Sequence, residues 1–197
     1  MEEIEELLML DVAAWGAWLA TQHAHAGAVW LVLAKKGTME PTSLTYDQAL
    51  EEALCHGWID GQVRRRDEVT FRQRFTRRRP RSAWSQRNVG IAQRLIAEGR
   101  MKPPGAAEIE RAQADGRWEA AYAGPASIEV PTELAAALAA SPAASETFSK
   151  LSGQNRYAIL YRIATAKQAQ TRTRRIEQFV EMLSRGETIH PQGTGRP

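Results

Sequence analysis

The sequence predicts an α+β fold in which a small antiparallel sheet, one strand plus a hairpin, is flanked by helices, with a C-terminal helical hairpin. A continuous apolar run at 28–35 has the length and character of a buried strand. Residues 59–66 and 69–77 alternate apolar and polar side chains on either side of Asp67-Glu68, as the two strands of a hairpin do. Most of the remaining chain places apolar residues at helical spacing.

Two helices are expected before the hairpin. Residues 11–22 carry an apolar stripe at helical spacing, made of Val12, Trp15, Trp18 and Leu19. Thr45 and Gln48 have the spacing of a capping box, which predicts a helix from Thr45 to about His56. Gly57 can end that helix in a left-handed conformation.

The chain after the hairpin is mostly helical. Ser82 or Ser85 can cap a helix that ends at Gly99, and Pro104 fits the first turn of a helix that ends at Gly116. A short alanine-rich helix is expected at 134–140. Two further apolar stripes, at 157–164 and 176–183, predict the C-terminal helical hairpin.

The length of 197 residues suits one domain with an appendage. We expect an α+β core domain at 1–123 and a helical subdomain at 131–186. Residues 187–197 contain two prolines and two glycines without an apolar pattern, so a disordered tail is expected there.

Several classes of protein are disfavoured by composition. No run of about 18 apolar residues exists, so no transmembrane helix is expected. The acidic start of the chain is unlike a signal peptide, and the single cysteine, Cys55, cannot form an internal disulfide. Together these features predict a cytoplasmic protein.

The net charge of +3 conceals a segregation along the chain. Residues 1–60 have a net charge of −8, and residues 61–102 have a net charge of +10. Such blocks suggest an anion-facing surface, although they can also neutralise each other across the fold.

The hairpin would collect part of the basic block on one face. Pairing predicts one face toward the core, bearing Val63, Val69, Phe71 and Phe75. The opposite face would then be a basic ladder, solvated or bound to an anion, bearing Arg64, Arg66, Arg72 and Arg74.

Beyond the hairpin, a helix start that directly follows several arginines favours bound anions, because backbone N–H groups and the helix dipole attract negative charge. The predicted anion-binding residues are Arg74, Arg78, Arg79, Ser82 and Ser85. The predicted supporting residues are Trp58, Asp60 and Trp84, with Asp60 holding Arg78 in place. Structural interpretations stay open: tryptophans in the core, serines as helix caps and Asp60 as a turn or ion-pair residue.

No catalytic or metal-binding residue is predicted. Cys55 and His56 are adjacent on a predicted helix and would point about 100° apart, so they do not form a nucleophile–base pair. His23 and His25 lack a convincing third ligand. The sequence contains no phosphate-binding glycine loop, and no cofactor is expected.

Two motifs in the chain resemble those of a known family. Gly57-Trp58-Ile59-Asp60-Gly61, followed by Arg74-Phe75-Thr76 and Ser82-Ala83-Trp84-Ser85, is similar to the YdeI/OmpD-associated family, also called bacteriocin-protection proteins. Further similar motifs occur in order over about residues 15–186. The chain departs at Arg77, where the family usually has proline, which adds charge and loosens the loop. The resemblance implies a bacterial stress-tolerance protein linked to survival against antimicrobial peptides, without an assigned reaction.

Three functional hypotheses follow. The first is a non-enzymatic stress-tolerance protein with a basic surface for an anionic ligand or polyanion. The second is an enzyme that acts on a small anionic substrate, with Asp60 and Arg78 at its site. The third is a module that binds cationic antimicrobial peptides through the acidic N-terminal third.

Overall fold

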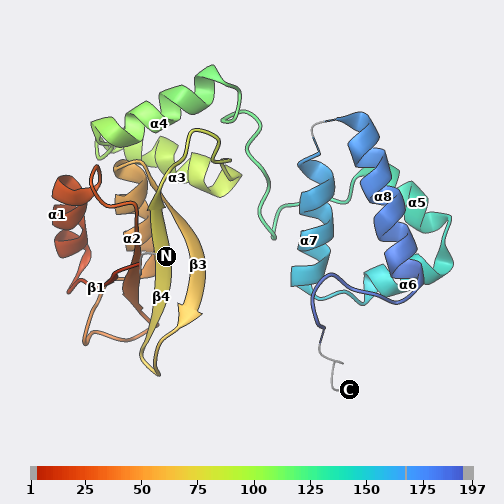
Figure 1. Ribbon diagram of the computed structural model, residues 1–197, viewed down its shortest axis with the longest axis horizontal. Helices are drawn as coiled ribbons and strands as arrows, with labels where there is room; N and C mark the ends of the chain where they lie inside the picture. The colour runs from red at the N-terminus through yellow and green to blue at the C-terminus, as the bar shows by residue number, and fades with distance from the viewer. Residues whose placement is uncertain (1–3, 167, 193–197) are drawn as a thin grey trace. The chain divides into compact units, whose positions relative to one another are not determined.

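The computed structural model describes residues 4–166 and 168–192. The chain folds as two compact units, Met1–Ala121 and Tyr122–Pro197, here called the N-terminal unit and the C-terminal unit (Figure 1). The N-terminal unit combines a sheet with helices, and the elements of the C-terminal unit are helices. Each unit has its own cluster of buried apolar residues. The predicted α+β fold class is confirmed.

Within the described residues, a four-stranded sheet has the order β1-β2-β4-β3. Its strands are β1 (Glu6–Leu8), β2 (Ala28–Ala34), β3 (Trp58–Arg65) and β4 (Thr70–Arg77). The three predicted strands are present, with β4 antiparallel to both β2 and β3. Strand β1 was not predicted, and its parallel pairing with β2 makes the sheet mixed. Three residues are too few for an alternating pattern to be recognised.

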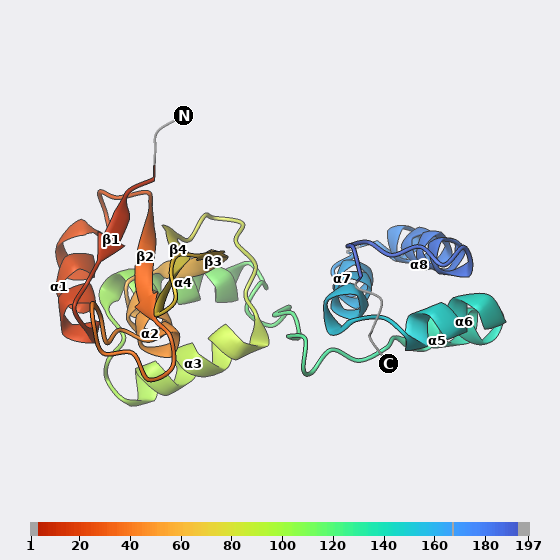
Figure 2. The same ribbon diagram turned by 90° about the horizontal axis from the view of Figure 1, so that it is seen from below.

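The helices of the N-terminal unit are α1 (Val12–Gln22), α2 (Tyr46–Cys55), α3 (Gln86–Ala97) and α4 (Pro103–Ala114). Figure 2 shows α1, α2 and α3 gathered on one side of the sheet. The capping box of Thr45 and Gln48 is present at the start of α2. Gly57 follows this helix with a φ of +74°, the left-handed conformation that glycine adopts without steric cost.

The main core lies between these helices and one face of the sheet. Trp15, Leu31, Trp58 and Phe75 are fully buried there. The indole N–H of Trp15 donates to the Ala49 carbonyl oxygen at 3.1 Å. This bond joins α1 to α2, and it lets the Trp15 ring be buried without leaving its polar atom unsatisfied.

Two of the four residues assigned to the core side of the hairpin are exposed. Phe75 is buried, but Val63 and Val69 are 64% and 46% exposed. Val63 pairs with Gln73 and so shares the core-side face, yet it lies on the edge strand β3 beyond a register shift after Asp60. The face on which Val63 lies was therefore predicted correctly, whereas the burial of Val63 and Val69 was predicted wrongly and the register shift was not predicted.

Helix α4 packs against the end of α2 through a glycine. A methyl group at Gly105 would lie 2.6 Å from the carbonyl oxygen of Leu54 and closer still to that of Cys55. No side chain fits at that distance, so α4 approaches the α2 backbone only because residue 105 is glycine.

The C-terminal unit contains α5 (Thr132–Ala139), α6 (Pro142–Ser149), α7 (Gly153–Ala164) and α8 (Ala169–Ser184). The predicted pair corresponds to α7 and α8, and α6 was not predicted. These helices surround a second core, whose fully buried members include Leu134, Ile159 and Leu183.

The first part of the predicted tail is held against α7. Asn155 is 1% exposed, and its side chain accepts from the His190 N–H at 2.9 Å and donates to the His190 carbonyl oxygen at 3.1 Å. The Gln192 side chain donates to the Lys150 carbonyl oxygen at 2.8 Å. Residues 187–192 thus complete the polar contacts of a buried amide. Residues 193–197 lie outside the described residues.

The substitution Phe75→Asp tests the assignment of the core face. Burying a carboxylate there should lower the free energy of unfolding by roughly 3–5 kcal/mol. All six tryptophans lie in residues 15–118, so denaturation followed by tryptophan fluorescence reports on the N-terminal unit. The matched control Val63→Asp should cost less than about 1 kcal/mol. Equal losses in the two variants would contradict the assignment.

Gly105→Ala and Gly90→Ala make the same change in two helices, and we expect them to change the free energy of unfolding in opposite directions. Gly105→Ala should destabilise the N-terminal unit by about 1–3 kcal/mol through overpacking. At Gly90 in α3, a methyl group would meet no described atom within 4 Å. Gly90→Ala should stabilise by about 0.5–1 kcal/mol, because alanine restricts the unfolded chain. Chemical denaturation measures both, and a stable Gly105→Ala protein would show that α4 can move away from α2.

Candidate anion-binding surfaces

The acidic and basic blocks meet in the N-terminal unit. Glu51 pairs with Arg94 and Arg100, and Glu52 pairs with Arg100 at 2.8 Å. Asp47 pairs with Arg87 at 2.8 Å. Part of the −8 block is therefore neutralised by side chains of the +10 block, in line with the second of the two interpretations of the charge pattern.

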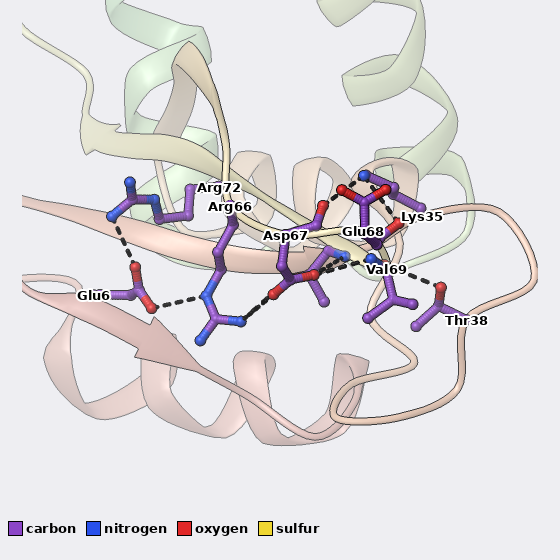
Figure 3. A network of polar contacts seen from close by, with 9 residues as sticks. Glu6, Lys35, Thr38, Arg66, Asp67, Glu68, Val69 and Arg72 are labelled. Atoms are coloured by element: carbon purple, nitrogen blue, oxygen red, sulfur yellow. Dashed lines mark hydrogen bonds and ion pairs between the residues drawn. The ribbon is translucent and has the colours of Figure 1, made fainter.

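Glu6 of β1 reaches across the sheet to two arginines (Figure 3). Its carboxylate accepts from Arg66 at 3.0 Å and from Arg72 at 2.9 Å. The side chains of these three residues are 31–36% exposed. On this part of the sheet, a carboxylate is therefore held between two guanidinium groups by charge-assisted hydrogen bonds.

The hairpin turn beside this contact is rigidly bonded. One oxygen of Asp67 accepts from the backbone N–H groups of Val69 and Thr70, at 2.9 and 2.7 Å, and the other accepts from the Thr70 hydroxyl. This hydroxyl, followed by the backbone donors, lowers the pKa of Asp67 to about 2. Lys35 donates to the carbonyl oxygens of Asp67 and Glu68 (Figure 3). The arginines next to the turn therefore project from a fixed backbone.

The face of the sheet opposite the main core is covered by arginines. Trp30, Val32 and Ala34 of β2 are buried, yet they are not part of the main core cluster. Trp30 pairs with Arg74, and Val32 pairs with Arg72, which in turn pairs with Arg64. The Arg64 guanidinium lies over the Trp30 ring, 4.5 Å from its centroid.

This surface, here called the arginine face, consists of Arg64, Arg66, Arg72 and Arg74. Arginine can cover apolar groups with its methylene stem while its guanidinium stays near water. The alternation predicted from the sequence therefore produces the basic ladder on the side away from the helices.

Arg78 lies apart from the arginine face, just after β4. It is 6% exposed, and its guanidinium lies over the Trp84 ring, 3.5 Å from the centroid. It also donates to the Ala83 carbonyl oxygen at 3.2 Å. Trp84 is 2% exposed and packs edge-on against Trp118. Trp84 is thus a core residue and offers no open ring for stacking.

The two predicted serines have separate structural roles. The Ser82 hydroxyl accepts from the Arg79 N–H at 2.9 Å, inside the loop before α3. The Ser85 hydroxyl accepts from the Asn88 N–H at 3.1 Å and so caps α3. Arg79 is exposed. The loop brings Arg78 onto Trp84, and Ser82 bonds to Arg79 within the same loop, whereas Arg74 belongs to the arginine face.

Asp60 faces α2. Its carboxylate accepts from the Tyr46 hydroxyl at 2.9 Å, and Arg87 donates to the same hydroxyl at 3.3 Å. Burial, followed by the charge of Asp60, raises the pKa of Tyr46 to about 12. The sequence hypothesis assigned Asp60 to Arg78, but the structure gives it a phenol as partner. Trp58, the other supporting residue, is fully buried in the core.

A pocket of about 210 Å³ was missed by the sequence analysis. It lies at the junction of α2 and β3, and its polar lining includes His23, His56, Arg77, Arg78, Glu108 and Arg111. The rings of His23 and His56 are 5.9 Å apart between centroids. No spacing in the sequence links these residues, because they come from four separate segments.

The cysteine and the histidines form no described metal centre. Burial, followed by the charge of Glu52, raises the pKa of the Cys55 thiol to about 11, which disfavours the nucleophilic thiolate. Within residues 4–166 and 168–192, no group of three or more His, Cys, Asp or Glu side chains is placed to hold a metal ion.

The fold and these surfaces define a two-unit α+β protein with a basic sheet face. Residues 7–108, more than half of the chain, match a family described as a domain of unknown function, DUF8412, and the chain belongs to that family. Residues 127–186 match the family described as "Bacteriocin-protection, YdeI or OmpD-Associated". The resemblance seen in the sequence is thus confirmed through the C-terminal unit.

The motifs around Trp58 and Trp84 lie in the segment that matches DUF8412. No curated protein and no solved structure matches the chain. In the described part of the chain, no helix has the length and apolar character needed to cross a membrane.

The Tyr46–Asp60 contact predicts a loss of stability at alkaline pH. The unfolded chain releases the phenol proton near pH 10 and the folded chain releases it near pH 12. The folded state therefore binds more protons in this interval, and its stability falls as the pH rises from about 10 toward 12. Denaturation followed by tryptophan fluorescence should show a shallower alkaline loss in Tyr46→Phe than in the parent. Parallel curves would contradict the raised pKa.

Proposed function

We propose that the N-terminal unit binds a phosphate-bearing polyanion through the arginine face, weakly and without sequence preference. The main observation in its favour is that Arg64 of β3, Arg72 and Arg74 of β4, and Arg66 just after β3 gather on the sheet face away from the main core, where Trp30 and Val32 lie. The proposal assigns no catalytic step to the protein.

The spacing of the arginine face suits a repeating anion. Arg72 and Arg74 are two residues apart on one strand, which separates their backbones by about 7 Å. Arg64 is paired directly with Arg72, so their backbones are about 5 Å apart. A chain of phosphates can therefore meet several guanidinium groups at once, each with a charge-assisted hydrogen bond.

The position of Glu6 also supports the proposal, because an internal anion already contacts two of the four arginines. Its carboxylate already occupies the position between Arg66 and Arg72 that an external phosphate oxygen would take. Arg64 and Arg74 have no salt bridge to a described residue, so they add positive charge that Glu6 does not offset. A polyanion would bind these two arginines and compete with Glu6 for the others.

The alternative functions have less support. A cationic peptide would need open carboxylates, but Glu6, Asp47, Glu51 and Glu52 are paired with arginines. An enzyme built on Asp60 would need that carboxylate as a base, but it accepts a hydrogen bond from Tyr46.

The family match of the C-terminal unit supports a proposal about the biological role of the protein. Residues 127–186 match a family whose description includes bacteriocin protection. We infer that the protein contributes to bacterial stress tolerance from the cytoplasm, with polyanion binding by the N-terminal unit as its molecular activity.

The variant Arg64→Gln/Arg74→Gln tests the arginine face. Binding of a labelled single-stranded oligonucleotide should weaken, and the slope of log affinity against log salt should decrease by about 1.4, or 0.7 for each lost phosphate contact. The matched control Arg172→Gln/Arg174→Gln removes the same charge from α8 and should keep the parental slope. Loss of binding only in the control would move the site to the C-terminal unit. Anionic lipid vesicles form a parallel arm, and vesicle binding without oligonucleotide binding would exclude nucleic acid as the polyanion.

Glu6→Gln should have the opposite effect. Removing the internal carboxylate releases Arg72 and takes away one of the two carboxylate partners of Arg66, the other being Asp67 at 2.7 Å. Affinity for the oligonucleotide should therefore rise about two- to fivefold, the equivalent of one exposed ion pair. Asp11→Asn removes a negative charge from the N-terminal cap of α1, and it serves as the matched control for net charge. Equal gains in both variants would show that only overall charge matters.

A further inference from the structure

We propose that the pocket between the α2–β3 junction, the end of β4 and α4 binds a small oxyanion of the phosphate or phosphate-monoester class. This junction pocket is lined in part by His23, His56, Arg77, Arg78 and Arg111. It is a separate site from the arginine face and goes beyond the proposed function.

The pocket forms where two glycines, Gly57 and Gly105, allow α4 to approach the end of α2 closely. Gly57 has a positive φ, and a methyl group there would lie 2.9 Å from the carbonyl oxygen of Pro104. Gly105 lets α4 pack on the end of α2, as described above. These contacts bring Glu108 and Arg111 of α4 beside Arg77, the last residue of β4, and Arg78, which follows it. The wall of the pocket is therefore built on backbone contacts that leave little room to shift.

The charge of the pocket favours an anion. Three arginines line it against one carboxylate, Glu108. One oxygen of that carboxylate accepts from Arg111 at 2.7 Å, and the other is buried without a hydrogen-bond partner among the described residues. Arg77 donates one N–H to the Ala24 carbonyl oxygen at 2.9 Å. A guanidinium carries five N–H donors in a planar fork, so Arg77 and Arg111 keep donors for a ligand in addition to these contacts.

Both histidines line the pocket and use one ring nitrogen for a backbone contact. The Nδ1 atom of His23 lies 2.9 Å from the Leu19 carbonyl oxygen, and that of His56 lies 3.0 Å from the Glu52 carbonyl oxygen. Since a carbonyl oxygen can only accept, both Nδ1 atoms must carry a proton. Each Nε2 is then the nitrogen that remains for a ligand, and as an acceptor it can take a hydrogen bond from the P–OH group of a phosphate monoanion.

The size of the pocket selects among anions. Sites for drug-sized ligands enclose about 300–1,000 Å³. At about 210 Å³ the junction pocket is smaller, and it suits a single phosphate group with a short substituent. Arginine forks match the geometry of phosphate oxygens in two parallel hydrogen bonds, which favours phosphate over chloride.

The histidines provide the test. Their ring Cε1–H signals are followed by NMR while sodium phosphate replaces sodium chloride at constant ionic strength and pH. The signals of His23 and His56 should shift and saturate. Those of His25, which is exposed, and His190, in the C-terminal unit, should not shift with the same saturation. The variants His25→Gln and His190→Gln assign the two control signals.

The variant Arg77→Gln/Arg111→Gln should weaken phosphate binding at least about tenfold, since hydrogen bonds to charged groups contribute about 1.5–3 kcal/mol each. Arg79→Gln/Arg81→Gln removes the same charge from the neighbouring loop and should keep the affinity within about twofold. Proportional shifts of all four histidines, or equal losses in both variants, would overturn the proposal. Methyl phosphate should bind as phosphate does, and acetate binding equally tightly would overturn the assignment to phosphates.

Discussion

The central strand β2 imposes the constraint on which the N-terminal unit depends. Every residue from Val29 to Ala34 is buried, so both faces of this strand must be covered. Helices cover the face that carries Val29, Leu31 and Leu33, and these residues belong to the main core. The other face, with Trp30 and Val32, is covered by side chains of the neighbouring strands. Because those side chains are arginines, the burial of an apolar strand creates a basic surface.

This arrangement gives the arginines two roles, one in covering the apolar strand and one in supplying charge. Their stems shield Trp30 and Val32 from water, and their guanidinium groups supply positive charge. Glu6 balances two of the four charges and ties the short edge strand β1 to the hairpin. A bound polyanion would replace this internal carboxylate, so binding would be coupled to the loss of the Glu6 contacts that attach β1 to the hairpin. A small anion in the junction pocket would act through different arginines and need not disturb the sheet.

Local signals in the sequence were sufficient for much of the fold. The capping box at Thr45, the positive φ at Gly57 and the apolar run of β2 depend on neighbouring residues, so they could be predicted. Strand β1 could not, because three residues owe their strand conformation to pairing with β2. The exposure of Val63 followed from its place on an edge strand, which alternation alone does not reveal.

The sequence by itself determined the α+β class, the segregation of charge and the set of arginines that share one sheet face. The charge blocks follow from the charged residues of each segment alone, and the other features follow from the spacing of apolar side chains, which has the period of a helix or a strand. Only the tertiary structure decided which charges remain available. It paired Glu51 and Glu52 with distant arginines, buried Arg78 against Trp84, and joined His23 to His56. Such contacts link residues far apart in the chain, and their partners are chosen by packing rather than by local spacing.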